Sequence, residues 1–284
     1  MTNTTRAAVI GADMPYVTTG NDRIELSYKD TTIDSFKVEP QEVRVRDARP
    51  LRDRLSLDTE GFLLADHGSA VALDPELIRE NGQPREDVPA INDRYADELI
   101  PLIRQLSGAR EVFPQYGTMQ VRFSNRAAHR SWLPTSAFTH MDFVTTQVEE
   151  LIQQTLRLTG REVAPYSRHC LIQTWRVITD PPQDMPLAVC DSRTTAAEDL
   201  IPLDYHGVEG SRNELLRSFA GRYAPRHEWY YFPDMTPDEV LVFKGFDSAM
   251  PEHTNVMHTA FDDTTVGDVV PRGSVECRFI ALFD

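Results

Sequence analysis

The chain has 284 residues, 40% of them hydrophobic, with 29 lysine and arginine residues against 44 aspartate and glutamate residues. A chain of this length can bury a substantial core, and its formal charge of −15 opposes broad contact with nucleic acid or anionic membranes. No apolar run is long enough to cross a bilayer, and the N-terminus lacks the basic-then-apolar layout of a signal peptide. We therefore expect a cytoplasmic protein without nucleic-acid or membrane partners.

The cysteines and the spread of turn residues bear on the domain organisation. Cys170, Cys190 and Cys277 are widely spaced and form no Cys-x-x-Cys pair, which supports neither a disulfide framework nor a zinc ribbon. Each fits a small buried apolar residue instead. Prolines and glycines are scattered, and no repeat is present. This favours one compact domain over residues 1–284.

The N-terminal part contains short extended segments. Ile24–Tyr28 and Glu42–Arg46 alternate apolar and polar side chains, as strands with one solvent-facing side do. We expect these two strands to pair as a hairpin. The hairpin would belong to an irregular N-terminal part, residues 1–60, that packs on the core.

Two helices are predicted further along the chain. Between Asp93 and Gly108 apolar residues recur at helical spacing, and Gly108 is placed to end the helix. A second periodic stretch runs from about Thr145 to Gly160.

Extended apolar runs dominate the rest of the sequence. They are Cys170–Ile178, Met185–Cys190, Trp229–Phe232, Glu239–Phe243 and Val275–Phe283. Several short strands separated by turn signals predict a mainly β fold, a sandwich or barrel with flanking helices.

The sequence Phe138-Thr-His-Met-Asp-Phe143 contains the most informative motif. On an extended strand, His140 and Asp142 point to the same side, so an imidazole nitrogen and a carboxylate oxygen can reach one metal ion. His258, far along the chain, would complete a face of two histidines and one carboxylate. That ligand set leaves three positions open and suits Fe(II) that must also hold a co-substrate and O₂.

His253 is the main rival to His258 as the distal ligand. Val256 and Met257 before His258, and Ala260 after it, suggest that His258 lies in a core-facing strand. His253 is more typical of a loop, so we predict His258 as the ligand.

An arginine that follows the distal histidine would bind the far carboxylate of a 2-oxo acid through forked hydrogen bonds. Arg272, Ser274 and Arg278 share one face of the predicted C-terminal strand because their spacing is even. Arg272-Gly-Ser274 has the Arg-x-Ser form, whereas Arg278 lies deeper in an apolar run, where an unpaired charge is costly. One arginine would anchor the co-substrate and the other would pair with Glu276. Periodicity does not choose between them.

Three further side chains are candidates for substrate binding. Tyr230 and Tyr231 fall on opposite faces of a strand, so one hydroxyl can line a cavity. Arg176, in Gln173-Thr-Trp-Arg176, is placed to meet an anionic substrate or the oxo acid.

These motifs together resemble a family of non-haem Fe(II)/2-oxoglutarate-dependent oxygenases. The family includes a cephamycin-pathway hydroxylase component, a fungal endoperoxide-forming enzyme and gibberellin-desaturase-like proteins. The resemblance extends over most of the chain after about residue 50. It is carried by Leu55–Phe62, Thr174–Arg176, Pro186–Arg193, His227–Met235, Glu239–Ser248, His258–Phe261 and Pro271–Arg278.

The resemblance implies a double-stranded β-helix, the cupin-like jelly roll, with Fe(II) held by His140, Asp142 and His258. It also implies 2-oxoglutarate as co-substrate and a small specialised metabolite as substrate. Relatives end their reactions in hydroxylation, desaturation, endoperoxide formation or ring closure, so membership does not fix the product. No heptads or exposed interface motif stand out in the sequence, so it does not predict an oligomeric state.

Two other classes of function remain possible on the sequence alone. One is a cupin-like metal-binding isomerase or binding protein that does not use 2-oxoglutarate. The other is a noncatalytic partner protein. Neither accounts for arginines that follow the distal histidine so closely.

Overall fold

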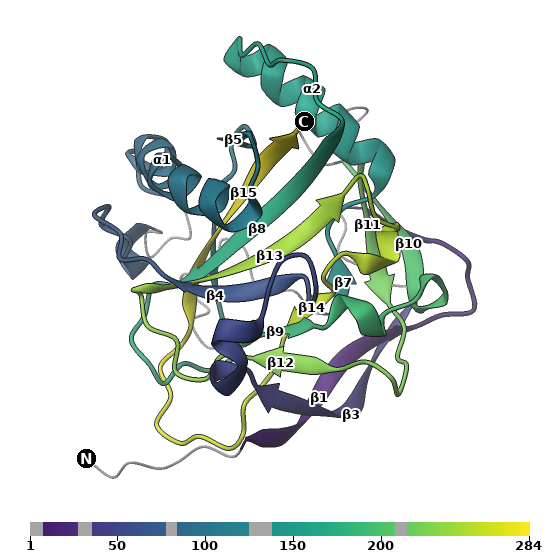
Figure 1. Ribbon diagram of the computed structural model, residues 1–284. Coiled ribbons are helices and arrows are strands. Elements are labelled where there is room, and N and C mark those ends of the chain that lie inside the picture. The colour runs from purple at the N-terminus through teal and green to yellow at the C-terminus, as the bar shows by residue number, and fades with distance from the viewer. Residues whose placement is uncertain (1–7, 28–35, 78–83, 125–137, 208–214) are drawn as a thin grey trace.

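Two β-sheets make up most of the molecule (Figure 1). The computed structural model describes residues 8–27, 36–77, 84–124, 138–207 and 215–284. The large sheet has nine strands in the order β1-β3-β12-β9-β14-β7-β11-β10-β2. The small sheet has six, in the order β4-β13-β8-β15-β5, with β6 also paired to β15.

The strands of the large sheet are β1 (Val9–Thr18), β2 (Ile24–Ser27), β3 (Lys37–Asp47), β7 (His140–Met141), β9 (Leu187–Cys190), β10 (Leu200–His206), β11 (Leu215–Gly221), β12 (Trp229–Tyr231) and β14 (His258–Ala260). Those of the small sheet are β4 (Phe62–Asp66), β5 (Glu111–Pro114), β6 (Gln120–Phe123), β8 (Arg168–Val177), β13 (Glu239–Asp247) and β15 (Gly273–Phe283). The α-helices are α1 (Val88–Ser107) and α2 (Thr145–Thr159), and short 3₁₀ helices include η1 (Arg49–Arg54), η4 (Ser192–Thr194) and η7 (Glu252–Thr254).

The two sheets face each other across an apolar layer. From the small sheet this layer takes Trp175, Leu241 and Phe243, and from the large sheet it takes Val189 and Tyr230. Burial of such side chains is the main favourable contribution to folding. The layer therefore joins the two sheets, and the fold is the double-stranded β-helix, or jelly roll, that we predicted.

Both outer faces are covered as well. Helix α1 packs Tyr95 and Leu99 against Ile172 of β8 and Cys277 of β15, on the outer face of the small sheet. The outer face of the large sheet buries a second cluster that includes Trp229. Strand β1 lies six strands from β11 in the sheet order yet contacts it, which shows how strongly the large sheet curls.

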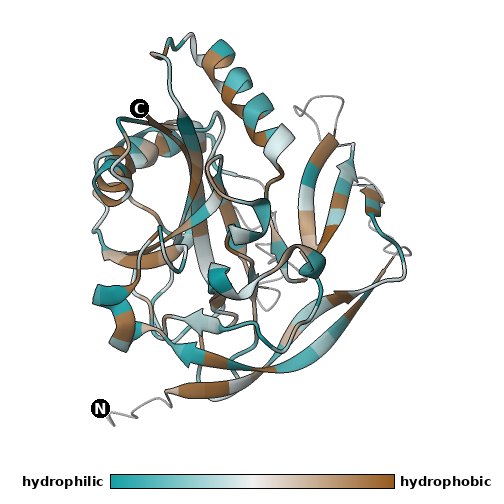
Figure 2. Ribbon diagram, turned by 45° about the vertical axis from the view of Figure 1, so that its right-hand side comes forward, coloured by the Kyte–Doolittle hydropathy of each residue, from teal (hydrophilic) through white to brown (hydrophobic). Residues whose placement is uncertain are grey.

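Helix α2 closes one end of the space between the sheets. Val148 and Ile152 pack with Phe143 and with Leu171 and Ile280 of the small sheet. Apolar and polar stripes alternate along α2 in Figure 2, as expected of a helix with one buried face. None of the helices in the described ranges is long and apolar enough to cross a membrane.

The predicted helices are confirmed, including their C-terminal ends. Gly108 and Gly160 follow α1 and α2 with φ of 68° and 63°, the left-handed conformation that glycine adopts at low cost. Helix α1 begins earlier than predicted, at Val88, where Pro89 occupies the first turn.

The N-terminal part differs from the prediction. Strand β3 pairs with β1 and β12, whereas β2 pairs with β10 at the opposite edge of the large sheet, so the expected hairpin of Ile24–Tyr28 with Glu42–Arg46 is wrong. Strands β1 and β3 are also long and regular, so much of residues 1–60 is ordered sheet. Tyr28 itself lies outside the described residues.

Candidate metal centre

Two short strands bring the histidines together. Strand β7 begins with His140 and β14 begins with His258, and the antiparallel register pairs these two residues directly. Their ring centroids lie 4.3 Å apart. Both imidazoles therefore project from neighbouring strands into the space between the sheets.

Asp142 completes the cluster from just beyond the end of β7. Its Oδ1 lies 3.4 Å from Nε2 of His140, and its Oδ2 lies 3.8 Å from Nε2 of His258. One ligand atom from each of the three residues lies within 4.8 Å of the others, and no other such group occurs in the described ranges. The three side chains predicted as ligands thus converge, although Asp142 follows the strand rather than lying within it.

Backbone carbonyls fix the tautomer of both imidazoles. Nδ1 of His140 lies 3.0 Å from the carbonyl oxygen of Phe138, and Nδ1 of His258 lies 3.1 Å from that of Val256. Because a carbonyl oxygen can only accept, each Nδ1 must carry the hydrogen and donate it. Each Nε2 then keeps its lone pair for a metal ion.

The charges of the cluster suit a cation. Burial raises the pKa of Asp142, but the positive charge of Arg278 and the two nearby imidazoles hold that pKa well below its usual range. Burial, together with the proximity of His140, lowers the pKa of His258 to about 4. At neutral pH the cluster therefore offers an anionic carboxylate and a neutral His258 imidazole, the forms that bind metals.

The small sheet presents a row of side chains to the cluster. Phe243, Gln173 and Arg278 are direct neighbours across β13, β8 and β15. Nε2 of Gln173 donates to Oδ2 of Asp142 at 2.6 Å, and Nη2 of Arg278 lies 3.4 Å from the same oxygen. The Phe243 ring centroid lies 4.9 Å from that of His258.

Arg278 is paired, as one of the two arginines was expected to be. Its Nη2 donates to Oε1 of Glu276 at 2.7 Å, and its guanidinium lies 5.2 Å from the Phe143 ring centroid. Oε2 of Glu276 also lies 3.4 Å from Nε of Arg122. Nε of Arg278 is buried without a hydrogen-bond partner in the described part of the chain.

Arg272 lies just before β15, at the other end of the space between the sheets, and is 2% exposed. Its Nη1 donates to the carbonyl of Met185 at 2.6 Å, and its guanidinium lies 5.3 Å from the Trp175 ring centroid. Burial, and next the charge of Arg122, lower the pKa of Arg272 to about 10. Among the residues described, no carboxylate lies within ion-pair distance, and its Nε has no partner. Ser274 is buried two residues further along.

Two of the three predicted substrate residues point elsewhere. Arg176 lies on the α1 side of β8, where it donates to the Tyr95 hydroxyl at 2.9 Å and to the carbonyls of His67 and Pro237. The Tyr231 ring packs against Phe261 in the outer cluster of the large sheet. Neither side chain faces the metal cluster.

Tyr230 does face the space between the sheets. It pairs with Val189, which in turn pairs with His258, so it belongs to the same row of the large sheet as both histidines. Two strand spacings separate it from His258, roughly 10 Å. Its hydroxyl donates to Glu228 at 3.2 Å, near the surface.

Gln173 is a polar neighbour of the cluster that sequence reasoning missed. It belongs to the same quoted segment as Arg176, and the two lie on opposite faces of β8. The spacing in the sequence indicates that residues 173 and 175 share one face of the strand, but it does not show that this face points toward the cluster. Which face points inward depends on the pairing of β8 with β13 and β15.

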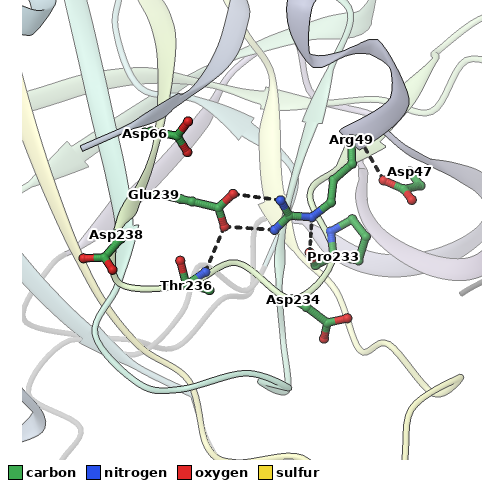
Figure 3. Close-up of a pocket in the computed structure, with 8 residues that line it drawn as sticks. All are labelled: Asp47, Arg49, Asp66, Pro233, Asp234, Thr236, Asp238 and Glu239. Carbon is green, nitrogen blue, oxygen red and sulfur yellow. Dashed lines mark hydrogen bonds and ion pairs between the residues drawn. The ribbon is translucent and has the colours of Figure 1, made fainter. Parts of the chain in front are cut away.

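A separate hollow of about 420 Å³ lies beside β4 and the start of β13, and contains none of the three ligands (Figure 3). It is lined by Asp47, Arg49, Asp66, Pro233, Asp234, Thr236, Asp238 and Glu239. Arg49 donates to both carboxylate oxygens of Glu239, at 2.7 and 2.9 Å, and so ties η1 to β13. Glu239 is buried, and its charge is therefore already paired with that of Arg49.

A jelly roll that carries two histidines and one aspartate at its interior defines a class of mononuclear metal-dependent oxidoreductases. Comparison with known proteins supports the assignment to this class. Residues 14–282 match a family described as oxidoreductase/YMDC permease-like domain. The chain is 30% identical to the Fe(II)/2-oxoglutarate-dependent dioxygenase nvfI of Aspergillus novofumigatus, over 87% of this chain and 85% of that one.

Other relatives and a solved structure lead to the same family. The gibberellin cluster GA4 desaturase of Gibberella fujikuroi is 25% identical, over 86% of this chain and 87% of its own. The structure of the iron and alpha-ketoglutarate-dependent endoperoxidase NvfI superposes with a TM-score of 0.76 and 25% identity, covering 97% of this chain and 98% of that one. The chain belongs to this family of Fe(II)/2-oxoglutarate-dependent oxygenases, as the sequence motifs predicted.

Proposed function

We propose that His140, Asp142 and His258 hold Fe(II), and that the enzyme uses 2-oxoglutarate and O₂ to oxidise a small organic molecule. The observation that carries this proposal is the ligand set itself, two imidazole nitrogens and one carboxylate that converge from β7, its following loop and β14. This set leaves three coordination positions open. When bound, the iron and 2-oxoglutarate supply the oxidant that removes hydrogen from a substrate carbon.

The surrounding cations fit a dicarboxylate co-substrate. Nε of Arg278, beside Asp142, and Nε of Arg272 both lack partners in the described ranges. A buried donor without a partner costs free energy, and a charged one costs more. A ligand that brings two carboxylates into this space would satisfy both arginines.

We assign the far carboxylate of 2-oxoglutarate to Arg272. Trp175, on which Arg272 stacks, lies two residues from Gln173 on the same face of β8, a step of roughly 7 Å. The Arg272 guanidinium therefore lies about one extended small molecule away from the metal cluster. Arg278 already pairs with Glu276 and faces Asp142, so it is placed to orient the end of the co-substrate nearest the metal. Ser274 is proposed to support Arg272.

The substrate is proposed to be a small specialised metabolite, as the names of several relatives suggest. Tyr230 is the candidate that faces the same space as both histidines. The three free, buried cysteines are compatible with the cytoplasm that we propose as its location. We also propose that residues 1–284 act as one oxygenase domain, since N-terminal β3 and C-terminal β15 belong to the two facing sheets.

Formation of succinate tests the proposed function. Protein supplied with Fe(II), 2-oxoglutarate, ascorbate and O₂ should form succinate slowly even without its substrate. Asp142→Ala should abolish this activity, because it removes the only anionic ligand of the cluster.

His253→Ala is the matched control. His253 lies in η7, outside the cluster, so the variant should keep the wild-type rate. Full succinate formation by Asp142→Ala would refute the ligand assignment. Metal binding by the wild type without any binding of 2-oxoglutarate would favour a cupin-like isomerase instead.

A further inference from the structure

We propose that Gln173 is a positioning residue that makes Asp142 bind the metal through one carboxylate oxygen only. The amide of Gln173 holds Oδ2 of Asp142, which leaves Oδ1 for the ion. This inference rests on the proposed function, because it concerns how an iron ligand is presented.

Hydrogen bonding divides the two oxygens of Asp142 between different partners. Oδ2 accepts from Nε2 of Gln173 at 2.6 Å, and Nη2 of Arg278 approaches the same atom at 3.4 Å. A carboxylate oxygen has two lone pairs, and these two donors occupy both. Oδ1 instead faces Nε2 of His140 at 3.4 Å, on the side where the ligand atoms converge.

Without the hydrogen bond from Gln173, Oδ2 of Asp142 would also be close enough to bind the metal. It lies 3.8 Å from Nε2 of His258, within the span of the ligand cluster. Carboxylates bind metals through one or both oxygens, and a second Asp142 oxygen would occupy one of the three open positions. A chelating co-substrate and O₂ need all three. The Gln173 amide therefore keeps the site open for chelation.

The position of Gln173 is strongly determined. It is 1% exposed and lies on β8 between Phe243 of β13 and Arg278 of β15. A β-bulge in β13 places Gly245 beside it, where any Cβ would clash with Oε1 of Gln173. The absence of a side chain at position 245 thus makes room for the amide.

Packing alone does not explain an amide at this position. Oε1 of Gln173 is buried and has no hydrogen-bond partner in the described part of the chain. A buried polar atom without a partner is destabilising, so an apolar side chain of similar volume would suit the core better. An amide at this position instead supplies the N–H group that donates to Oδ2 of Asp142.

The test uses Gln173→Met in the full-length protein, loaded anaerobically with Co(II) in place of Fe(II). Absorption titrations give the Kd for Co(II) alone and then the Kd for 2-oxoglutarate on the loaded protein. We expect the Kd for 2-oxoglutarate to rise about 10- to 100-fold. The affinity for Co(II) should fall much less, and the visible Co(II) spectrum should change before 2-oxoglutarate is added.

Gly245→Ala is a second variant that should break the hydrogen bond from Gln173 to Asp142, because its Cβ displaces the amide without altering a ligand. It should also weaken 2-oxoglutarate binding, and it serves as the test if Gln173→Met does not fold. Thr174→Val is the matched control, since Thr174 is the adjacent buried residue on β8 and its hydroxyl approaches the carbonyl of Cys277. This control should bind both ligands as the wild type does.

The outcomes separate the two proposals. If the wild type binds Co(II) but not 2-oxoglutarate, the proposed function itself is wrong. If the wild type binds both and folded Gln173→Met binds 2-oxoglutarate equally well, only the role of Gln173 is refuted. Equal losses of Co(II) and 2-oxoglutarate affinity would show a merely structural role and would also refute it.

Discussion

Arg272 is almost fully buried, and its guanidinium contacts the Trp175 ring and one carbonyl, with no carboxylate of the described residues in ion-pair distance. Burial of an uncompensated cation destabilises a folded chain. We propose that a bound carboxylate offsets the cost of burying the Arg272 guanidinium. At the scale of single residues, the proposed role of Arg272 therefore predicts a link between co-substrate affinity and a cost in stability.

Arg272→Met tests that link. We expect the Kd for 2-oxoglutarate to rise on the order of 100-fold, because about 3 kcal/mol of charge-assisted hydrogen bonding is lost. The melting temperature of the metal-free protein should not fall, since an apolar side chain replaces a buried charge. Calorimetric titration of Mn(II)-loaded protein and thermal melts measure the two effects.

Arg176→Met is the contrasting variant. Arg176 is equally buried but donates to Tyr95, His67 and Pro237, so its loss should lower the melting temperature and leave the Kd for 2-oxoglutarate unchanged. Wild-type affinity in Arg272→Met would instead assign the far carboxylate to Arg278.

The order of residue types predicted which three side chains converge, but not the orientation of every neighbour. His140, Asp142 and His258 could be found because their chemistry and spacing are specific. Arg176 was misplaced because β8 is buried on both faces, by α1 and by the large sheet, so hydrophobic alternation does not reveal which residues point inward. Gln173 was missed for the same reason.

At the scale of elements, the end of β13 connects stability to the metal site. After the bulge beside Gln173, Asp247 accepts from Nε and Nη2 of Arg168 at 2.9 and 2.6 Å and from Nζ of Lys244 at 3.2 Å. The bonds from Arg168 join β13 to β8, and the bond from Lys244 spans the bulge within β13. Loss of Asp247 would therefore loosen the strand that carries Gly245.

The stability that Asp247 contributes should depend on pH. Burial opposes its charge, but the hydrogen bonds from Arg168 dominate and lower its pKa from 3.8 to about 2. A lowered pKa stabilises the fold above the unfolded value, and this contribution is lost as pH falls through the folded value. Asp247→Asn should cost about 2 kcal/mol at pH 7, and the difference from wild type should shrink between pH 4 and 2.

Urea unfolding at several pH values measures this difference. Asp58→Asn makes the same chemical change at an exposed carboxylate 3.7 Å from Arg168, so it should have little effect. A cost for Asp247→Asn that stays constant down to pH 2 would contradict the assigned role.

Sequence patterns predicted elements better than they predicted pairing. Both helices carried a 3.6-residue period and a terminal glycine, which are local signals. Strand β2 pairs with β10 rather than with β3, and that choice depends on contacts between residues far apart in the chain. Strand β1 was missed although Ile10, Met14 and Tyr16 alternate with less buried residues.

At the scale of the whole molecule, the metal would join segments that are distant in sequence. His140 belongs to a two-residue strand and His258 to a three-residue strand, and Asp142 lies in a loop. An ion that binds only the assembled site stabilises the folded state by mass action.

Metal addition should therefore raise the melting temperature. At a free Mn(II) concentration 100 times its Kd, the gain is about 2.7 kcal/mol, or roughly 5–10 °C for a chain of this size. Differential scanning fluorimetry with Mn(II), and then with excess chelator, measures the shift and its reversal. Asp142→Ala should show little or no shift, and an equal shift in that variant would indicate binding elsewhere.

Both imidazoles are oriented by the main chain rather than by side chains, through the carbonyls of Phe138 and Val256. Point substitutions at those two positions change the buried side chains beside the histidines but keep the backbone acceptor that selects the tautomer. Side-chain substitutions at positions 138 and 256 should therefore leave the hydrogen bonds at both Nδ1 atoms in place. Mutagenesis around the cluster can therefore vary side-chain volume at these two positions while both imidazoles keep the tautomer that leaves Nε2 unprotonated.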